Sequence, residues 1–191
     1  PSGAGGAERQ QYLLGEALLR RGNRVSLVTR NYNDGARYEE SNGFAVWKTI
    51  PDVRGIVNAP LKAFRIFDTL CQIDADVFYV RGNDFLTMVT AAYCHFASVK
   101  FVYSVSSDSN VEPDTLESYH HLHRCAFIAS IRDAEGVVAQ TEYQRSVLAD
   151  IHGIDSIIIP NGYEVPPKET VLPHSEREYV LWVGRMARDQ K

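Results

Sequence analysis

Hydrophobic residues along the chain follow two alternating patterns. In the first, Ala7, Leu14 and Leu18 recur at helical spacing, so that they form one apolar stripe. In the second, short apolar runs such as residues 77–80 are typical of buried strands. Together the patterns predict helices at about 7–21, 63–73, 85–96, 114–133 and 142–151, and strands at 25–29, 44–50, 77–80, 101–105, 136–139 and 157–159.

Near-continuous apolar strands separated by helices are typical of a parallel sheet covered on both faces. The sequence therefore predicts a Rossmann-like, doubly wound α/β domain over residues 1–162. A glycine-rich loop opens the first helix with no strand before it, so we expect the first strand of the sheet to be missing. A gap should then lie beside strand 25–29, which should not pair directly with strand 77–80.

The last part of the chain has a different composition. Residues 163–178 carry several prolines and mixed charges, which is typical of a linker between domains. Residues 179–191 begin with a new apolar run that no helix follows. We therefore expect the first strand of a second, truncated domain there.

Composition narrows the classes of partner. The chain has 191 residues, 45% hydrophobic and 23% charged, which is ordinary for a globular protein. A net charge of −4 argues against nucleic acid as the main partner, because phosphate backbones require a basic surface. No apolar run reaches the ~18 residues that a membrane span needs. Three widely spaced cysteines form neither a metal pattern nor a disulfide framework, which indicates the reducing cytoplasm.

The glycine-rich loop is the first candidate binding element. Glycines before a helix let an anion approach the backbone amides and the positive end of the helix dipole. Gly3 and Gly5 fit a dinucleotide fingerprint, but its third glycine would fall on Glu8, which disfavours a nicotinamide cofactor. The loop also lacks the Lys-Ser/Thr pair of a nucleoside-triphosphate site. A tight turn without a ligand is the alternative.

Polar residues follow most of the predicted strands. Because open α/β sheets bind ligands at the carboxyl ends of their strands, we expect these residues to line one crevice. Arg81 and Asp108 should face the same crevice as Gly5 and Gly6. An arginine that ends an apolar strand indicates an anion or a salt bridge. The alternative is that loops are polar everywhere. The strand-end candidates are Arg81, Ser106, Asp108, Thr141, Glu142 and Asn161.

Three histidines gather in the predicted helix 114–133. His120 and His123 would lie one turn apart, a spacing at which two side chains can share a metal ion. No third ligand stands at a suitable spacing beside them. A partly solvated helix face is therefore the favoured interpretation, and we expect no metal site.

Several segments, taken in order, resemble one family. They are residues 1–30, 75–81, 134–142, 159–162 and 181–185. Together they resemble the amino-terminal domain and the start of the second domain of retaining glycosyltransferases of family 4, which have the GT-B fold.

The resemblance implies two Rossmann-like domains that face each other across a cleft. The amino-terminal domain would bind the acceptor, with Gly5 and Gly6 approaching the donor phosphates or the acceptor. Arg185 and Lys191 match the spacing of a pair that holds the donor diphosphate. No cofactor and no metal are implied, because cations and helix dipoles neutralise the leaving group. A solvated basic tail is the alternative for Arg185 and Lys191.

One departure concerns the end of strand 101–105. Many family members have a histidine there that contacts the transferred sugar, whereas this chain has Ser106 or Ser107, followed by Asp108. Ser106 and Asp108 are thus the catalytic candidates, and Gly5, Gly6, Arg81, Thr141, Glu142 and Asn161 the substrate-binding ones.

The resulting hypothesis is the acceptor-side half of a cytoplasmic, retaining hexosyltransferase, inactive by itself. Its implied partners are a nucleotide sugar and a carbohydrate, lipid or small-molecule acceptor, and a peripheral membrane contact is compatible with them. The alternative is a non-catalytic module that binds a sugar or nucleotide on a degenerate GT-B domain.

Overall fold

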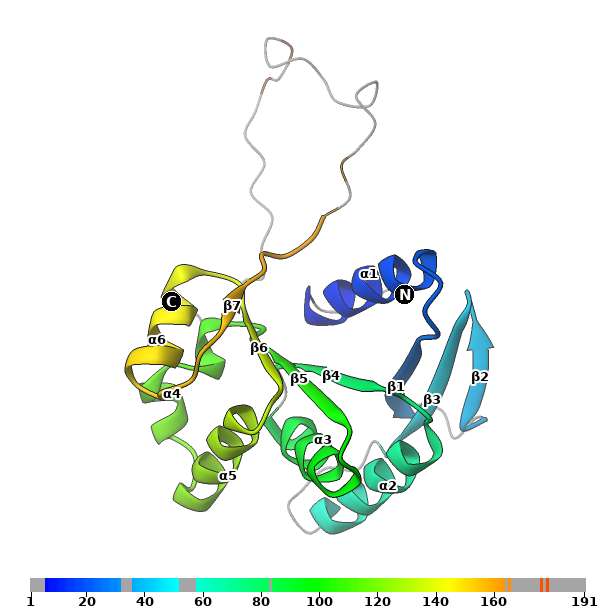
Figure 1. Cartoon of the computed structure of the whole chain (residues 1–191), viewed down its shortest axis with the longest axis horizontal. Helices are drawn as coiled ribbons and strands as arrows, with labels where there is room; N and C mark the ends of the chain where they lie inside the picture. Colours follow the sequence, from blue (N-terminus) through cyan, green and yellow to red (C-terminus); the bar gives the residue numbers. More distant parts are fainter. Residues whose placement is uncertain are drawn as a thin grey trace.

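The computed structural model describes residues 6–31, 36–51, 58–82 and 84–163, together with positions 165, 176 and 178. Figure 1 shows helices on both sides of the strands, with α1 on the side opposite α2 and α3. The helices are α1 (Gly6–Arg20), α2 (Ala59–Gln72), α3 (Asp84–Ala97), α4 (Pro113–Glu117), α5 (His121–Arg132) and α6 (Glu142–Asp150).

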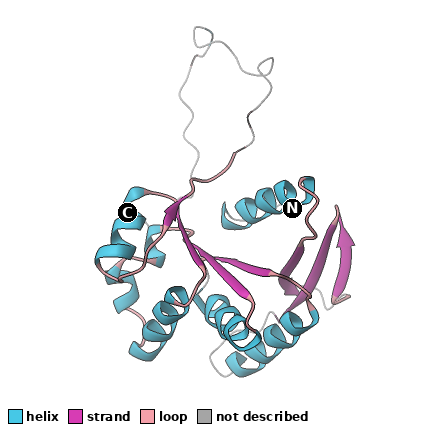
Figure 2. Ribbon diagram, viewed as in Figure 1, coloured by secondary structure: helices cyan, strands magenta, loops and turns pink. Residues whose placement is uncertain are grey.

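The strands form two sheets (Figure 2). One contains β4 (Val77–Arg81), β5 (Lys100–Ser104), β6 (Gly136–Ala139) and β7 (Ile157–Ile158), in that order and all parallel. This parallel sheet with flanking helices confirms the predicted Rossmann-like α/β class.

The second sheet has three strands in the order β1-β3-β2. In it, β1 (Ser26–Asn31) runs parallel to β3 (Phe44–Pro51), and β2 (Tyr38–Ser41) runs antiparallel to β3. Among the described residues no ladder joins β1 to β4, so strand 25–29 does not pair directly with strand 77–80.

Strand β2, which runs antiparallel to β3, was not predicted from the sequence. That strand and β3 are joined by Asn42 and Gly43, whose φ angles are 52° and 82°. A two-residue turn with positive φ at both positions joins antiparallel strands, and Asn-Gly is the pair that best tolerates it. The hydrophobic pattern missed β2 because all four of its residues are exposed.

The single helix predicted over residues 114–133 was also wrong. The chain leaves the helix after α4, where the Ser118 hydroxyl donates to the Thr115 carbonyl at 2.6 Å. His120 then has an extended backbone (φ −57°, ψ 137°) and precedes the first residue of α5. His120 and His123 therefore do not share one helix. No group of three or more His, Cys, Asp or Glu side chains that could hold a metal occurs in the described part of the chain.

Helix α1 is held against the first sheet through Gly15, its one buried residue. A Cβ at Gly15 would lie 2.6 Å from Cε1 of Phe44, a ring that is only 2% exposed. The Tyr12 ring also packs on Phe44, with a centroid distance of 5.5 Å. The helix thus approaches the sheet closely because residue 15 has no side chain.

Replacing Gly15 by alanine should lower the free energy of unfolding by about 1–3 kcal/mol, the usual cost of overpacking a core. The clash with Phe44 should outweigh the better helix propensity of alanine. Gly6→Ala is the matched control, because nothing lies within 4 Å of a Cβ at Gly6. Chemical denaturation measures both variants. If Gly15→Ala were as stable as the parent protein, Phe44 would be able to move away from the new methyl group at no cost.

The three cysteines are free, and they differ in exposure. Cys71 and Cys125 are exposed, whereas Cys94 is buried in the core. Burial raises the pKa of the Cys94 thiol from 9.0 to about 11. Because the folded state holds this proton more tightly, its contribution to stability is complete below about pH 9. It is lost as the pH rises through 11.

At pH 8, iodoacetamide should therefore alkylate Cys71 and Cys125 and leave Cys94 unmodified, because the thiolate is the reactive form. Peptide mass spectrometry reads out each site. In denaturant all three should react, which serves as the control. Equal rates at Cys94 and Cys71 in the native protein would contradict the burial.

Candidate functional site

Arg81, the last residue of β4, connects three strand ends at the carboxyl edge of the parallel sheet. Its Nη1 donates to Ser104 Oγ at 3.2 Å, at the end of β5. Its Nη2 donates to Asn161 Oδ1 at 2.6 Å, in the loop after β7. The structure thus brings together Arg81 and Asn161, which are 80 positions apart in the sequence.

Among the described residues, the buried guanidinium of Arg81 has no ion-pair partner. The residue is 9% exposed, and its Nε atom is buried with no hydrogen-bond partner. The ion pairs found among the described residues join other side chains. A buried charge is costly unless it is paired and hydrogen-bonded. Arg81 therefore places a positive charge at this edge, where its two Nη atoms donate to Ser104 and Asn161.

Ser106 lies beside the end of β4 and is fixed by Asn110 of the short helix η2 (Asp108–Asn110). Its amide and hydroxyl both donate to Asn110 Oδ1, at 3.0 and 2.7 Å. A Cβ at Gly82, where φ is +63°, would lie 2.4 Å from Ser106 Oγ. The absence of a side chain at Gly82 therefore allows β4 to end against the Ser106 hydroxyl.

Asp108 is held in place by Gln144 of α6. The Gln144 Nε2 atom donates to Asp108 Oδ1 at 2.8 Å, while its Oε1 accepts from the Gln140 amide at 2.8 Å. Gln144 is 2% exposed. Its amide group uses both its donor and its acceptor to connect the ends of β5 and β6. This glutamine was not among the predicted site residues, because no spacing in the sequence distinguishes it from a surface residue.

Two further sequence candidates lie at the start of α6. The Thr141 hydroxyl accepts from the Gln144 amide at 3.2 Å and caps the helix. Glu142 is exposed and pairs with Arg145 one turn later. In this structure both side chains therefore stabilise the beginning of α6.

Tyr143 of α6 contacts Glu112, the residue that precedes α4. The Tyr143 hydroxyl donates to Glu112 Oε1 at 3.4 Å. Desolvation, followed by the charge of Glu112, raises the pKa of Tyr143 above its ordinary value. The hydroxyl is therefore protonated at neutral pH.

The beginning of α1 reaches the same edge through Gln10. Its Nε2 donates to the Gly162 carbonyl at 2.8 Å, and its Oε1 accepts from the Gly162 amide at 2.9 Å. One side chain therefore binds both polar groups of one residue, next to Asn161. Gly6 lies about one turn before Gln10, at the exposed start of the helix. Gly5, Arg185 and Lys191 lie outside the described residues.

A hollow of about 370 Å³ lies away from this edge, at the amino end of β5. It includes Lys100 and the exposed pair of His95 and Asp133, whose Nδ1 and Oδ2 atoms are 3.0 Å apart. None of the strand-end candidates lines it.

The fold and the edge define an α/β domain of the ligand-binding Rossmann-like class. Within that class, the family model described as Glycosyltransferase Family 4 matches residues 4–165, most of the chain. The chain belongs to this family, which confirms the predicted family and supports a transferase activity. None of the curated proteins compared with the chain matches it. Among the described helices, none combines the length and apolarity needed to cross a membrane.

Proposed function

We propose that the protein transfers a hexose from a nucleotide-diphosphate sugar to an acceptor with retention of anomeric configuration. In this proposal residues 1–162 form the acceptor side, residues 163–178 the linker and residues 179–191 the start of the donor domain. The observation that carries the acceptor role is Arg81, whose positive charge lies at the carboxyl edge in contact with Ser104 and Asn161. Family membership supports the sugar chemistry.

The polar edge would bind the acceptor through hydrogen bonds. Arg81 would hold one of its polar groups, while Ser106 and Asp108 contact the reacting hydroxyl or the sugar. Both side chains are already oriented, by Asn110 and Gln144 respectively, so little ordering is needed when the substrate binds. A preorganised polar site of this kind stabilises charge that develops in the transition state.

The donor would be bound mainly by the second domain. There Arg185 and Lys191 would neutralise the diphosphate as the glycosidic bond breaks, a role that needs no metal ion. The acceptor would be a carbohydrate, a lipid or a small molecule. A cytoplasmic location is consistent with three free thiols.

The experiment is an activity screen of the full-length protein with pooled nucleotide sugars and candidate acceptors. Nuclear magnetic resonance of the product should show the anomeric configuration of the donor retained. The 191-residue chain alone should give neither transfer nor donor hydrolysis above the blank, because most donor contacts would lie in the second domain. Robust turnover by the short chain would refute the two-domain proposal. An inverted product would refute retention, and sugar binding without transfer by the full-length protein would favour the non-catalytic module.

A further inference from the structure

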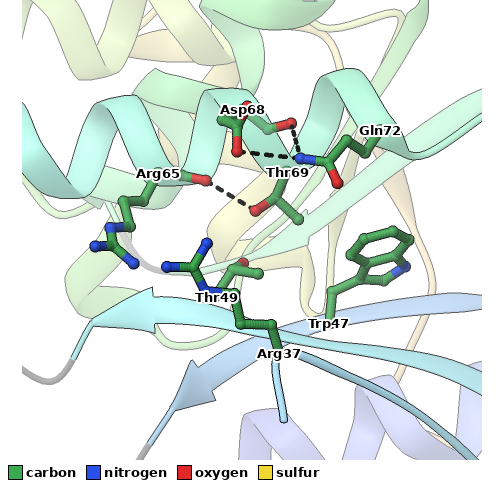
Figure 3. A pocket seen from close by; sticks show the side chains of 7 residues that line it. All are labelled: Arg37, Trp47, Thr49, Arg65, Asp68, Thr69 and Gln72. Carbon is green, nitrogen blue, oxygen red and sulfur yellow. Dashed lines mark hydrogen bonds between the residues drawn. The ribbon is translucent and has the colours of Figure 1, made fainter. Parts of the chain in front are cut away.

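A small cavity lies between α2 and the first sheet, away from the Arg81 edge. Its volume is about 60 Å³. Figure 3 shows its side chains, which come from β3, from α2 and from the residue before β2. None of them belongs to the strand-end site. They are Arg37, Trp47, Thr49, Arg65, Asp68, Thr69 and Gln72.

Two arginines from different elements share this cavity. Arg37 is fixed beside β3, because its carbonyl accepts from the Lys48 amide at 2.8 Å. Arg65 comes from α2 on the other side, and Figure 3 shows both guanidinium groups turned toward the space between sheet and helix. Among the described residues neither makes an ion pair. Asp68 also lines the cavity, so the described lining carries a net charge of +1, which an anion beside the two guanidinium groups would offset.

A third donor comes from β3. The Thr49 Oγ1 atom is buried and has no hydrogen-bond partner among the described residues. An unsatisfied buried hydroxyl is unfavourable, so a ligand that accepts its hydrogen would stabilise the protein. The neighbouring Thr69 hydroxyl is already used, because it donates to the Arg65 carbonyl at 2.8 Å.

Among the described lining residues, one carboxylate, that of Asp68, accepts a hydrogen bond from a neighbour on its own helix. Asp68 Oδ2 accepts from Gln72 Nε2 at 3.1 Å, and the Asp68 carbonyl accepts from the same nitrogen at 3.2 Å. The Trp47 side chain also lines the cavity, and its ring packs edge-on against Tyr38 with a centroid distance of 5.0 Å. Asp68 keeps its negative charge, but among the described lining residues two guanidinium forks and the Thr49 hydroxyl remain as donors, which suit a ligand that accepts hydrogen bonds.

We infer that this cavity binds one phosphate-class oxyanion, either free phosphate or the phosphate group of an ester. Planar guanidinium forks match the geometry of phosphate oxygens, and such charge-assisted bonds are strong. One water needs about 10–15 Å³ of such space, so 60 Å³ admits a five-atom anion but not a whole nucleotide sugar. The site does not depend on the proposed transferase activity.

The test measures binding of sodium phosphate to the 191-residue chain and to the full-length protein by calorimetry and thermal unfolding. Sodium chloride at equal ionic strength is the control salt. Phosphate should raise Tm above its value in sodium chloride, because a ligand that binds the folded state stabilises it. Arg37→Ala and Arg65→Ala should each weaken phosphate binding about tenfold or more, the effect of a lost charged hydrogen bond.

Arg24→Ala is the matched control, since it removes one positive charge from an exposed arginine that pairs with Asp74. It should bind phosphate as tightly as the parent. The inference is overturned if phosphate stabilises no more than chloride, or if Arg24→Ala weakens binding as much as Arg37→Ala and Arg65→Ala do.

Thr49→Val separates ligand binding from stability. Valine has a similar shape and removes a hydroxyl without a partner, so Tm without phosphate should not fall. The phosphate affinity should fall by about threefold or more, because a hydrogen bond to a charged ligand is lost. Unchanged phosphate binding would place the anion elsewhere and overturn the assignment. Glycerol phosphate distinguishes the two sources of the oxyanion, because it is a phosphate ester. If it binds as tightly as phosphate, the cavity accepts an ester group. If phosphate binds and glycerol phosphate does not, the ligand is the free ion.

Discussion

Replacing Arg185 or Lys191 by alanine in the full-length protein is expected to lower the rate of sugar transfer about a hundredfold. In the proposed reaction the diphosphate leaving group would gain negative charge as the glycosidic bond breaks. Cations beside it would then stabilise the transition state more than the bound donor. The measurement is kcat with saturating donor and acceptor, together with circular dichroism to show that the fold is intact.

The same segment offers a matched control. Arg188 lies between the two residues in the sequence, so Arg188→Ala makes the same change in charge without breaking the Arg-x5-Lys pattern. It should keep near-parental activity. Near-parental turnover in both Arg185→Ala and Lys191→Ala would reduce the pair to surface charge.

The second large effect concerns Arg81. Arg81→Ala should raise KM for the acceptor about tenfold to a hundredfold and change donor affinity much less. The substitution removes a charged hydrogen-bond donor from the carboxyl edge, where we propose that the acceptor substrate binds. A hydrogen bond from a charged group contributes about 1.5–3 kcal/mol. Steady-state kinetics with each substrate varied in turn separate the two constants. Equal losses toward both substrates, or no loss, would contradict an acceptor role.

Because Arg81 is buried, its removal also affects the fold, and a second variant is needed. Asn161→Asp keeps the guanidinium and gives Nη2 a carboxylate partner in place of an amide. This variant should be at least as stable as the parent and still use the acceptor less well, since the charge of Arg81 is then neutralised. Arg132→Ala is the surface control, because that residue is exposed and its guanidinium donates to the His152 carbonyl.

The sequence predicted the features that follow from local hydrophobic pattern. The bounds of buried strands such as β4 and β5 were predicted to within one residue, because each strand is a short apolar run between amphipathic helices. Its position at the carboxyl end of a predicted strand also placed Arg81 among the binding candidates. β2 was missed because it has no buried face, although Asn42-Gly43 contains the signal for its hairpin.

The contacts that build the site were harder to predict. Gln10 and Gly162 are 152 positions apart, and Gln144 meets Asp108 across 36 positions. Such pairs depend on how loops pack, which no periodicity records. The break before α5 depends on a Ser118 hydrogen bond that competes with the helix backbone, and the apolar stripe continues across it.

The separation of the two sheets has a practical consequence for anyone who purifies this chain. Within the described residues, β1 pairs only with β3 and β4 pairs only with β5, so each keeps one side on which no ladder has formed. Unpaired backbone along a strand is a template for another extended chain. At high concentration, two copies can satisfy these groups by exchanging a strand or by stacking edge to edge. Low protein concentration and short storage should therefore keep preparations of the 191-residue chain monodisperse.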